Sequence, residues 1–245
     1  GLGFNAGYYN TGWTRNIAIW TYALENNLAS DNTAIGHSSL QVNVTWYNNT
    51  AMGSYSLYLN STGSDNTALG HVALFSNTVG YDNTAIGSHA LYYNTWWFSN
   101  TAIWASALFY NTIGTYNTAV WINTLYSNTS GWWNNAFGDS SLYSNTTGMG
   151  NTAQWFLSLN HNTTWNHNVA IWTDALYENT EGSSNVAIWW DSMLSNTQWF
   201  DNSAIGFESL HSNTTGSNHT AFWYQTAYNI VAIGWITPNT AIGYR

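Results

Sequence analysis

The chain has 245 residues, of which 44% are hydrophobic and 18% aromatic but only 5% charged, and its net charge is −9. Two Arg and no Lys cannot form the basic patch that nucleic acids or anionic membranes require, which excludes both as partners. The absence of Cys excludes disulfides and thiol chemistry, and no run of about 20 apolar residues predicts membrane insertion in this segment.

The first region, residues 1–33, is predicted to contain irregular N-terminal turns, because the step from Ala18 to Ala34 is 16 residues and not the 17 found afterwards. The chain begins at Gly1 without a signal peptide and ends at Arg245 in a pattern that looks unfinished. We therefore interpret it as a processed chain or a segment of a longer fibre.

Residues 34–220 contain eleven units of exactly 17 residues, and each unit starts at an Ala, from Ala34 to Ala204, with Ala221 opening the next. A short fixed period is typical of stacked units that cannot bury a hydrophobic face alone. We number positions in a unit from this Ala as 0, call one unit a rung, and call residues at one position of successive rungs a column.

One rung reads Asn-Thr-Ala-Ile-Gly, then Ala-Leu, then Asn-Thr-x-Gly, most clearly from Asn83 to Thr95. Helical spacing of apolar residues is absent, and Gly and Asn recur too often for a helix. Two short extended segments, Thr-Ala-Ile and Ala-Leu-aromatic, are expected in each rung. The sequence thus predicts an all-β parallel β-solenoid (a β-roll or β-helix) with rungs about 4.8 Å apart.

Two apolar columns are predicted to form the core. Position +6 is Leu in all rungs but one, and position +1 is mostly Ile, with the polar Gln154 as an exception. The core residues expected from these columns are Leu40, Leu57, Leu74, Leu91, Leu108, Leu125, Leu142, Leu159, Leu176, Leu210, Ile35, Ile86, Ile103, Ile171, Ile188 and Ile205.

The Ala column should face away from the Ile column, because strand neighbours alternate between faces. An invariant Ala indicates close packing against a second surface, and we expect that surface to be another copy of the chain. The candidate interface residues are Ala51, Ala68, Ala85, Ala102 and Ala119. The chain would then form a homo-oligomer, either a trimer or an end-to-end filament. The alternative is a monomeric solenoid whose narrow interior holds the Ala column.

Asn fills position +9 in every complete rung, and it fills position −2 in all but one. Asn is a turn residue, and identical Asn side chains stacked at one rung spacing form amide ladders. The ladder residues expected at position +9 are Asn43, Asn60, Asn77, Asn94, Asn111, Asn128, Asn145, Asn162, Asn179, Asn196 and Asn213.

Positions +2 and +12 hold either Gly or Trp and nothing else in the complete rungs, and twelve of the 17 Trp lie in these two columns. Gly-requiring turns do not tolerate Trp, and ordinary drift would also leave Ala, Ser, Asn or Asp. One hypothesis is that UGA codons, which mean Trp in one genetic code and Gly in another, were read with the wrong code. The alternative is a genuine exposed Trp stripe that stacks on carbohydrate.

The last region, residues 221–245, is predicted to contain shortened rungs or a junction to a further segment. The spacing of Ala falls after Ala221, at Ala232 and Ala241, and Pro238 is the only Pro. Irregular terminal repeats are expected in solenoids.

Catalytic chemistry is not indicated. The seven His are spread over several columns without metal-ligand spacing, and no P-loop or nucleophile motif is present. We predict no enzyme activity, no catalytic residue, no metal site and no cofactor.

The rung Asn202–Gly216 resembles the head repeats of trimeric autotransporter adhesins of the YadA type, and related repeats of phage tail fibres and other surface fibres. The resemblance covers nearly the whole chain. It implies a left-handed parallel β-roll that trimerises and binds host or matrix surfaces, although those heads use a shorter unit.

The function expected from the sequence is a non-catalytic, rigid structural fibre or adhesin segment, extracellular, on a cell surface or in a virion fibre. Two alternatives remain. Thr fills position +10 in nine of eleven rungs and is frequent at position −1, which is compatible with an ice-binding face. Exposed Trp would suit a carbohydrate-binding rod.

Overall fold

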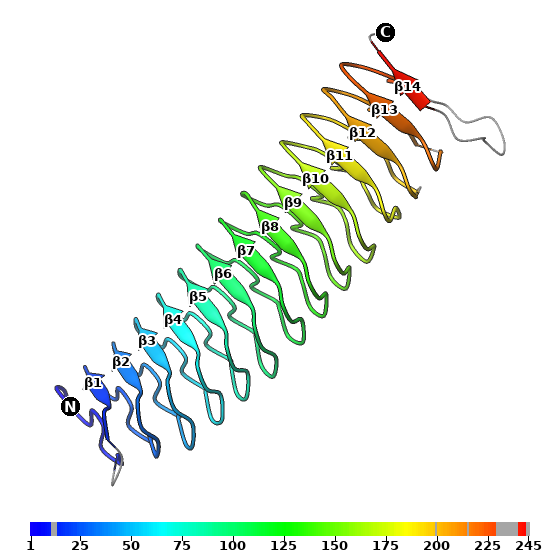
Figure 1. The fold of residues 1–245 in the computed structure, drawn as a ribbon. Helices are drawn as coiled ribbons and strands as arrows, with labels where there is room; N and C mark the ends of the chain where they lie inside the picture. The colour runs from blue at the N-terminus through cyan, green and yellow to red at the C-terminus, as the bar shows by residue number, and fades with distance from the viewer. Residues whose placement is uncertain (11–13, 199, 215, 229–239, 244–245) are drawn as a thin grey trace. The chain divides into compact units, whose positions relative to one another are not determined.

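The computed structural model describes residues 1–10, 14–198, 200–214, 216–228 and 240–243. The chain divides into two compact units, Gly1–Asn123 and Thr124–Arg245, and each is described by itself. Figure 1 shows the strands of both units in chain order.

The first unit contains seven parallel strands of three residues, each paired with the next in sequence. Ala pairs with Ala in adjacent strands, as for Ala34 with Ala51 and Ala68 with Ala85. The strands are β1 Ile17–Ile19, β2 Thr33–Ile35, β3 Thr50–Met52, β4 Thr67–Leu69, β5 Thr84–Ile86, β6 Thr101–Ile103 and β7 Thr118–Val120.

The second unit repeats the arrangement with seven more parallel strands, again with Ala opposite Ala. The strands are β8 Asn135–Phe137, β9 Thr152–Gln154, β10 Val169–Ile171, β11 Val186–Ile188, β12 Ser203–Ile205, β13 Thr220–Phe222 and β14 Thr240–Ile242. Each unit is therefore a β-solenoid of parallel strands, as the sequence predicts, and no helix occurs in the residues that the structure describes.

The second extended segment predicted in each rung is wrong, because the Ala-Leu-aromatic stretch is a chain of turns. Non-strand geometry follows from positive φ at alternate residues, for example 138° at Gly70, 50° at Val72 and 53° at Leu74. The turns are still hydrogen-bonded to the neighbouring rungs. Leu74 N donates to Ala90 O at 2.9 Å, and Val72 N donates to Ser54 O at 3.0 Å.

The interior of each rung is narrow. The Leu column is fully buried throughout, with Met193 in one rung, which confirms the Leu residues as core. The Ala column is also fully buried from Ala34 to Ala221, and position +5 holds small residues such as Ala90 and Ser56 that are buried as well. The interior of a rung is therefore packed with one Leu and two small side chains.

The Ile column is not core, which corrects the prediction for Ile35, Ile86, Ile103, Ile171, Ile188 and Ile205. Each of these side chains is half-buried on the outside of its strand. The strand has only two faces, and the inner one is so close to the Leu column that only Ala fits there. The outward position also explains Gln154, whose amide remains partly accessible at position +1.

The Ala column is likewise not an interface, which corrects the prediction for Ala51, Ala68, Ala85, Ala102 and Ala119. All five are fully buried within a single chain. The alternative of a narrow interior that takes the Ala column describes the structure.

The last rung step differs from the regular ones. Strand β14 pairs with β13 in the register Ala221 to Ala241. Ala232 and Pro238 lie outside the described residues, so the shortened C-terminal rungs remain a prediction.

Candidate functional site: the outer face of the sheet

The Asn columns are structural, as the sequence predicts. All eleven Asn at position +9 are fully buried. Asn77 Nδ2 donates to Asn60 Oδ1 at 2.8 Å and to Gly80 O of its own turn at 2.9 Å, and Asn94 Nδ2 donates to Asn77 Oδ1 at 3.0 Å. Each amide therefore satisfies a turn carbonyl and binds the next rung. These Asn do not have positive φ, whereas the Leu column does.

The Asn at position −2 form a second buried ladder with a different geometry. The backbone N of Asn83 donates to Asn66 Oδ1 at 3.1 Å, and Asn83 Nδ2 donates to the same oxygen at 3.2 Å. Asn66 Nδ2 reaches Gly80 O in the next rung at 2.8 Å. Both ladders are largely occupied by internal contacts; among the described residues, the Nδ2 of Asn202 and the Oδ1 of Asn213 are buried without a hydrogen-bond partner.

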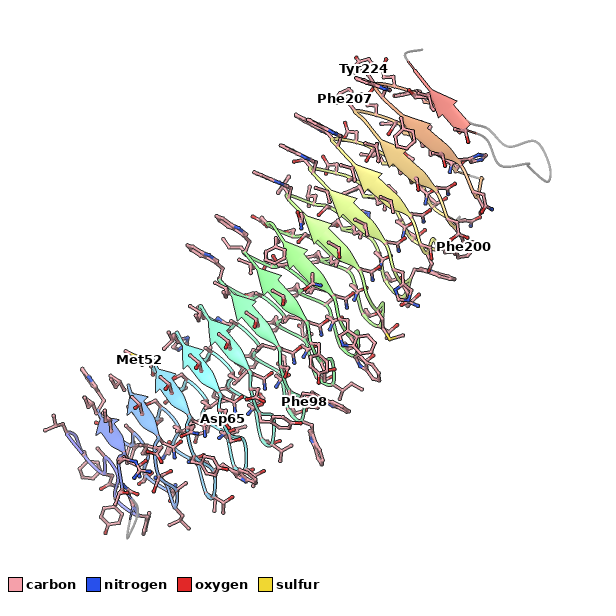
Figure 2. All side chains as sticks on the ribbon, in the orientation of Figure 1. Met52, Asp65, Phe98, Phe200, Phe207 and Tyr224 are labelled. Atoms are coloured by element: carbon pink, nitrogen blue, oxygen red, sulfur yellow. The ribbon has the colours of Figure 1, made fainter. Side chains whose placement is uncertain are left out.

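The two residues that flank Ala in every strand point outward, and we call them the outer sheet face. They are half-buried or exposed in strands β2 to β13. Position −1 is mostly Thr and position +1 mostly Ile, and neither column contains a charged residue. Met52 at +1 is 43% exposed and is labelled in Figure 2, and Phe137 at +1 is 39% exposed. This face is a neutral, mostly apolar strip that repeats once per rung.

Trp side chains at position +2 lie beside the outer sheet face and stack where they occupy consecutive rungs. The ring centroids are 5.5 Å apart for Trp104 and Trp121, and 5.2 and 5.3 Å apart for Trp155, Trp172 and Trp189. Stacking covers the faces between neighbouring rings, but these five side chains are still 37% to 55% exposed. The carbohydrate-binding alternative therefore stays a prediction.

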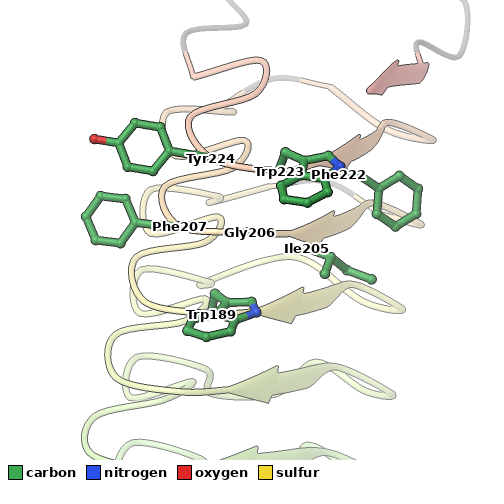
Figure 3. Close-up of a pocket in the computed structure, with 7 residues that line it drawn as sticks. All are labelled: Trp189, Ile205, Gly206, Phe207, Phe222, Trp223 and Tyr224. Atoms are coloured by element: carbon green, nitrogen blue, oxygen red, sulfur yellow. The ribbon is translucent and has the colours of Figure 1, made fainter. Parts of the chain in front are cut away.

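A pocket of about 450 Å³ lies where this Trp column is interrupted (Figure 3). Gly206 has no side chain between Trp189 and Trp223, and the space is bordered by Phe207 and Tyr224. The pocket therefore owes its existence to the alternation of Gly and Trp in one column.

The Thr column at position +10 is engaged within the chain. Thr78 Oγ1 donates to Thr95 O at 3.0 Å, and Thr95 Oγ1 donates to Thr112 O at 3.2 Å. The second unit repeats the contact, with Thr129 Oγ1 donating to Thr146 O at 3.0 Å. Hydroxyl protons committed to the backbone are not free to match an ice lattice, so the column at position +10 does not favour the ice-binding alternative. For the Thr at position −1, which lie on the outer sheet face, this alternative stays a prediction.

Charged groups form few contacts. Arg15 makes a two-pronged ion pair with Asp31, with N–O distances of 2.5 and 2.6 Å, and the hydrogen bonds from Arg15 lower the pKa of Asp31. Burial raises the pKa of Asp174, and burial together with repulsion from Asp174 raises that of Asp191.

Among the described residues, no three His, Asp or Glu come close enough to hold a metal ion. None of the described segments is a helix that is both long and apolar enough to cross a membrane.

His219 occupies the Asn column at position −2 and is the one buried titratable side chain there. It is 1% exposed, neither ring nitrogen has a hydrogen-bond partner, and the Nδ2 of Asn202 in the preceding rung is also unpaired. Burial lowers the pKa of His219. The unfolded chain therefore binds a proton that the folded chain does not, and stability falls as the pH drops through about 6.5 towards the lowered pKa.

Replacing His219 by Asn is expected to raise the melting temperature and to flatten its decline between pH 7 and pH 5. An Asn here can make the amide contact that Asn83 makes to Asn66 at 3.2 Å. Thermal unfolding of both proteins across this pH range measures the effect. The contributions of Asp174 and Asp191, which weaken stability as pH rises, are common to both proteins and cancel. Equal pH profiles would contradict the assignment.

Comparison of the chain with protein-family models, curated proteins and solved structures finds no match in any of the three.

Proposed function

We propose that this chain is a non-catalytic structural segment of an extracellular fibre or adhesin, which assembles with further copies of itself through the outer sheet face. The observation that carries the proposal is the uncharged outer sheet face, which is half-buried or exposed in strands β2 to β13, with mostly Thr at position −1 and an apolar residue at position +1 in all of them but β9. The internal columns already have structural contacts in both units. The outer sheet face, in contrast, consists of repeated residues that are available for interaction.

A second copy of the chain fits this face better than an unrelated partner. Copies share the same rung spacing, so an Ile column on one copy meets an Ile column on the other at every rung. A weak contact is then multiplied along the stack. Neither column carries a charge, so association desolvates no ionic group, and nothing on the face selects a charged partner. The resemblance to adhesin heads favours a trimer, and a filament is the alternative assembly.

An extracellular or surface location suits the rest of the sequence. Only 5% of the residues are charged, and the chain has a single Arg in its regular and N-terminal regions, so few sites are available to trypsin-like proteases. The backbone of the turns is hydrogen-bonded to adjacent rungs, which protects it from local opening and proteolysis.

Replacing Ile86 and Ile103 together by Lys is expected to dissociate the assembly while leaving the fold intact. Both side chains are half-buried on the outer sheet face of adjacent rungs. Burying an unpaired ammonium in an interface costs more than about 1.4 kcal/mol, so dissociation should occur at a protein concentration at least tenfold higher than for the unmodified chain. Sedimentation velocity over a concentration series measures this change.

The matched control replaces Tyr93 and Tyr110 by Lys. These residues belong to the same two rungs, are 40% and 42% exposed, and lie in the turns away from the outer sheet face. The control should assemble as the unmodified chain does. A monomeric unmodified chain at every concentration, or unaltered assembly of the Ile variant, would refute the proposed interface.

A further inference from the structure

The twelve Trp at positions +2 and +12 lie in two columns where a Cβ built on a glycine, such as Gly36 or Gly63, would collide with neighbouring atoms. We propose that these residues are glycine in the protein as its own cells make it, because their codons are UGA and the cells decode UGA as glycine. The Trp concerned are Trp20, Trp104, Trp121, Trp155, Trp172, Trp189 and Trp223 at +2, and Trp13, Trp46, Trp97, Trp165 and Trp199 at +12.

The backbone at position +2 has a dihedral angle that suits glycine. The Gly residues of this column in the complete rungs, such as Gly36 and Gly206, have φ between 132° and 140°. The Trp residues also have positive φ, from 89° at Trp104 to 116° at Trp121. Positive φ is strained for any residue with a Cβ and is most unfavourable for a large side chain. Each Trp departs from the angle that the glycines share.

The neighbouring rung also blocks a side chain at position +2. A Cβ placed on Gly36 would lie 2.6 Å from the carbonyl carbon of Gly53, and one placed on Gly70 would lie 2.7 Å from that of Gly87. The obstacle is backbone, which is fixed by hydrogen bonds such as Gly70 N to Met52 O at 2.8 Å. A glycine is therefore required by close approach as well as by φ.

Position +12 excludes a side chain for a different reason. A Cβ on Gly63 would collide with Asn60 Oδ1 and Gly80 O, and it would lie 2.8 Å from Asn77 Nδ2. These atoms belong to the buried Asn ladder. Trp46, Trp97 and Trp165 stand in this column, whereas Trp13 and Trp199 lie outside the described residues. Glycine is thus required at positions +2 and +12 for two independent geometric reasons, and both columns show the same replacement of Gly by Trp.

The tryptophans gain little that would offset the strain. Trp20 and Trp223 are 64% and 68% exposed, and Gly occupies position +2 in the rungs on either side of each of them. Stacking therefore cannot explain why Trp occurs at these two places. Selection for an aromatic stripe would fill consecutive rungs without interruption, whereas Gly138 and Gly206 interrupt the column between Trp104 and Trp223.

A cause at the level of codons explains why only Gly and Trp occur at positions +2 and +12. GGA and UGA differ by one base, and the exchange is silent where UGA encodes glycine. Drift between them would scatter apparent Trp among Gly positions and would introduce no Ala, Ser or Asp, as observed in the complete rungs.

The natural protein then has a different surface from the one in Figure 3. Without the indoles of Trp189 and Trp223, the pocket beside Gly206 loses two of its aromatic walls and keeps Phe207, Phe222 and Tyr224. The Trp stacks would be absent as carbohydrate platforms. The outer sheet face would then lack the Trp side chains beside it.

The first test reads the gene and the protein from the cells that make it. We expect UGA codons at the twelve positions, and peptides across Trp104, Trp121, Trp155 and Trp172 whose masses are those of glycine. Tryptophan masses in these peptides would overturn the proposal. UGG codons in the two columns would overturn it equally.

The second test compares two full-length proteins made in a host with the standard code. One carries the twelve Trp, and the other carries Gly at all twelve positions and keeps the remaining five Trp. The Gly protein is expected to unfold at a higher temperature and a higher denaturant concentration. An equal or lower melting temperature of the Gly protein would contradict the geometric argument. Because peptide masses from the natural source do not depend on refolding, the proposal stays testable if the Trp protein does not fold.

Discussion

An Ala102→Leu variant is expected to be strongly destabilised, and its melting temperature should fall well below that of the unmodified chain. Ala102 is fully buried in the narrow interior, and Ala85 and Ala119 lie opposite it in the adjacent strands. Extra methylene groups in a packed interior cost about 1 to 3 kcal/mol, and here the obstacle includes the fixed backbone of two rungs. Chemical denaturation followed by circular dichroism measures the loss.

Ala105→Leu is the matched control for this prediction. Ala105 belongs to the same rung, undergoes the same chemical change and is half-buried at position +3 outside the interior. We expect a change within about 0.5 kcal/mol, as for surface substitutions away from special features. If Ala102→Leu instead dissociated a complex into folded monomers of normal stability, the Ala column would be an interface and the burial argument would fail.

An Asn179→Asp variant is expected to lose stability by roughly 2 to 6 kcal/mol in total, because two buried acceptors lose their donor at about 1 to 3 kcal/mol each. Asn179 Nδ2 donates to Asn162 Oδ1 at 3.0 Å and to Gly182 O at 2.7 Å, and its Oδ1 accepts from Asn196 Nδ2 at 3.1 Å. Aspartate has nearly the same shape but no proton to donate at neutral pH. Equilibrium unfolding at pH 7 measures the loss.

The pH dependence of this variant has a defined sign. Burial raises the pKa of a carboxyl group at position 179 above its unfolded value, so the folded state binds the proton more tightly. Stability relative to the unmodified chain should therefore be highest in acid and fall as the pH rises through the folded pKa. Asn218→Asp is the control, because Asn218 is exposed in a column that already contains Asp201. Equal stability of both Asp variants would show that the ladder contributes nothing.

The repeat by itself determined the fold class and the register. A 17-residue period without helical spacing leaves stacked rungs as the way to bury its Leu, and identical rungs pair Ala with Ala. The Leu column was predictable because position +6 holds a large apolar residue in every complete rung, Leu in all but the rung with Met193. The Asn ladders followed from the same periodicity, since identical amides one rung apart can hydrogen-bond.

Only the tertiary structure decided which side of the strand faces inward. Because strand neighbours alternate between faces, either the Ala column or the Ile column could face inward, and hydrophobicity favoured Ile35 and Ile86. The inner face of the strand nevertheless holds Ala alone. The width of the interior is set by the turns, where positive φ at alternate residues brings Leu74 and Leu91 close behind the strand. No local sequence pattern reports that distance.

The candidate interface changed from the Ala column to the outer sheet face for the same reason. From the sequence, the Ala column looked like a contact with another chain, because its neighbour inside the rung could not be seen. The structure supplies that neighbour and turns the Ile column outward. The sequence showed that positions +2 and +12 hold only Gly or Trp in the complete rungs, but it did not show why other side chains are excluded there. That cause is the approach of one rung's backbone to the next, which arises only when the rungs stack.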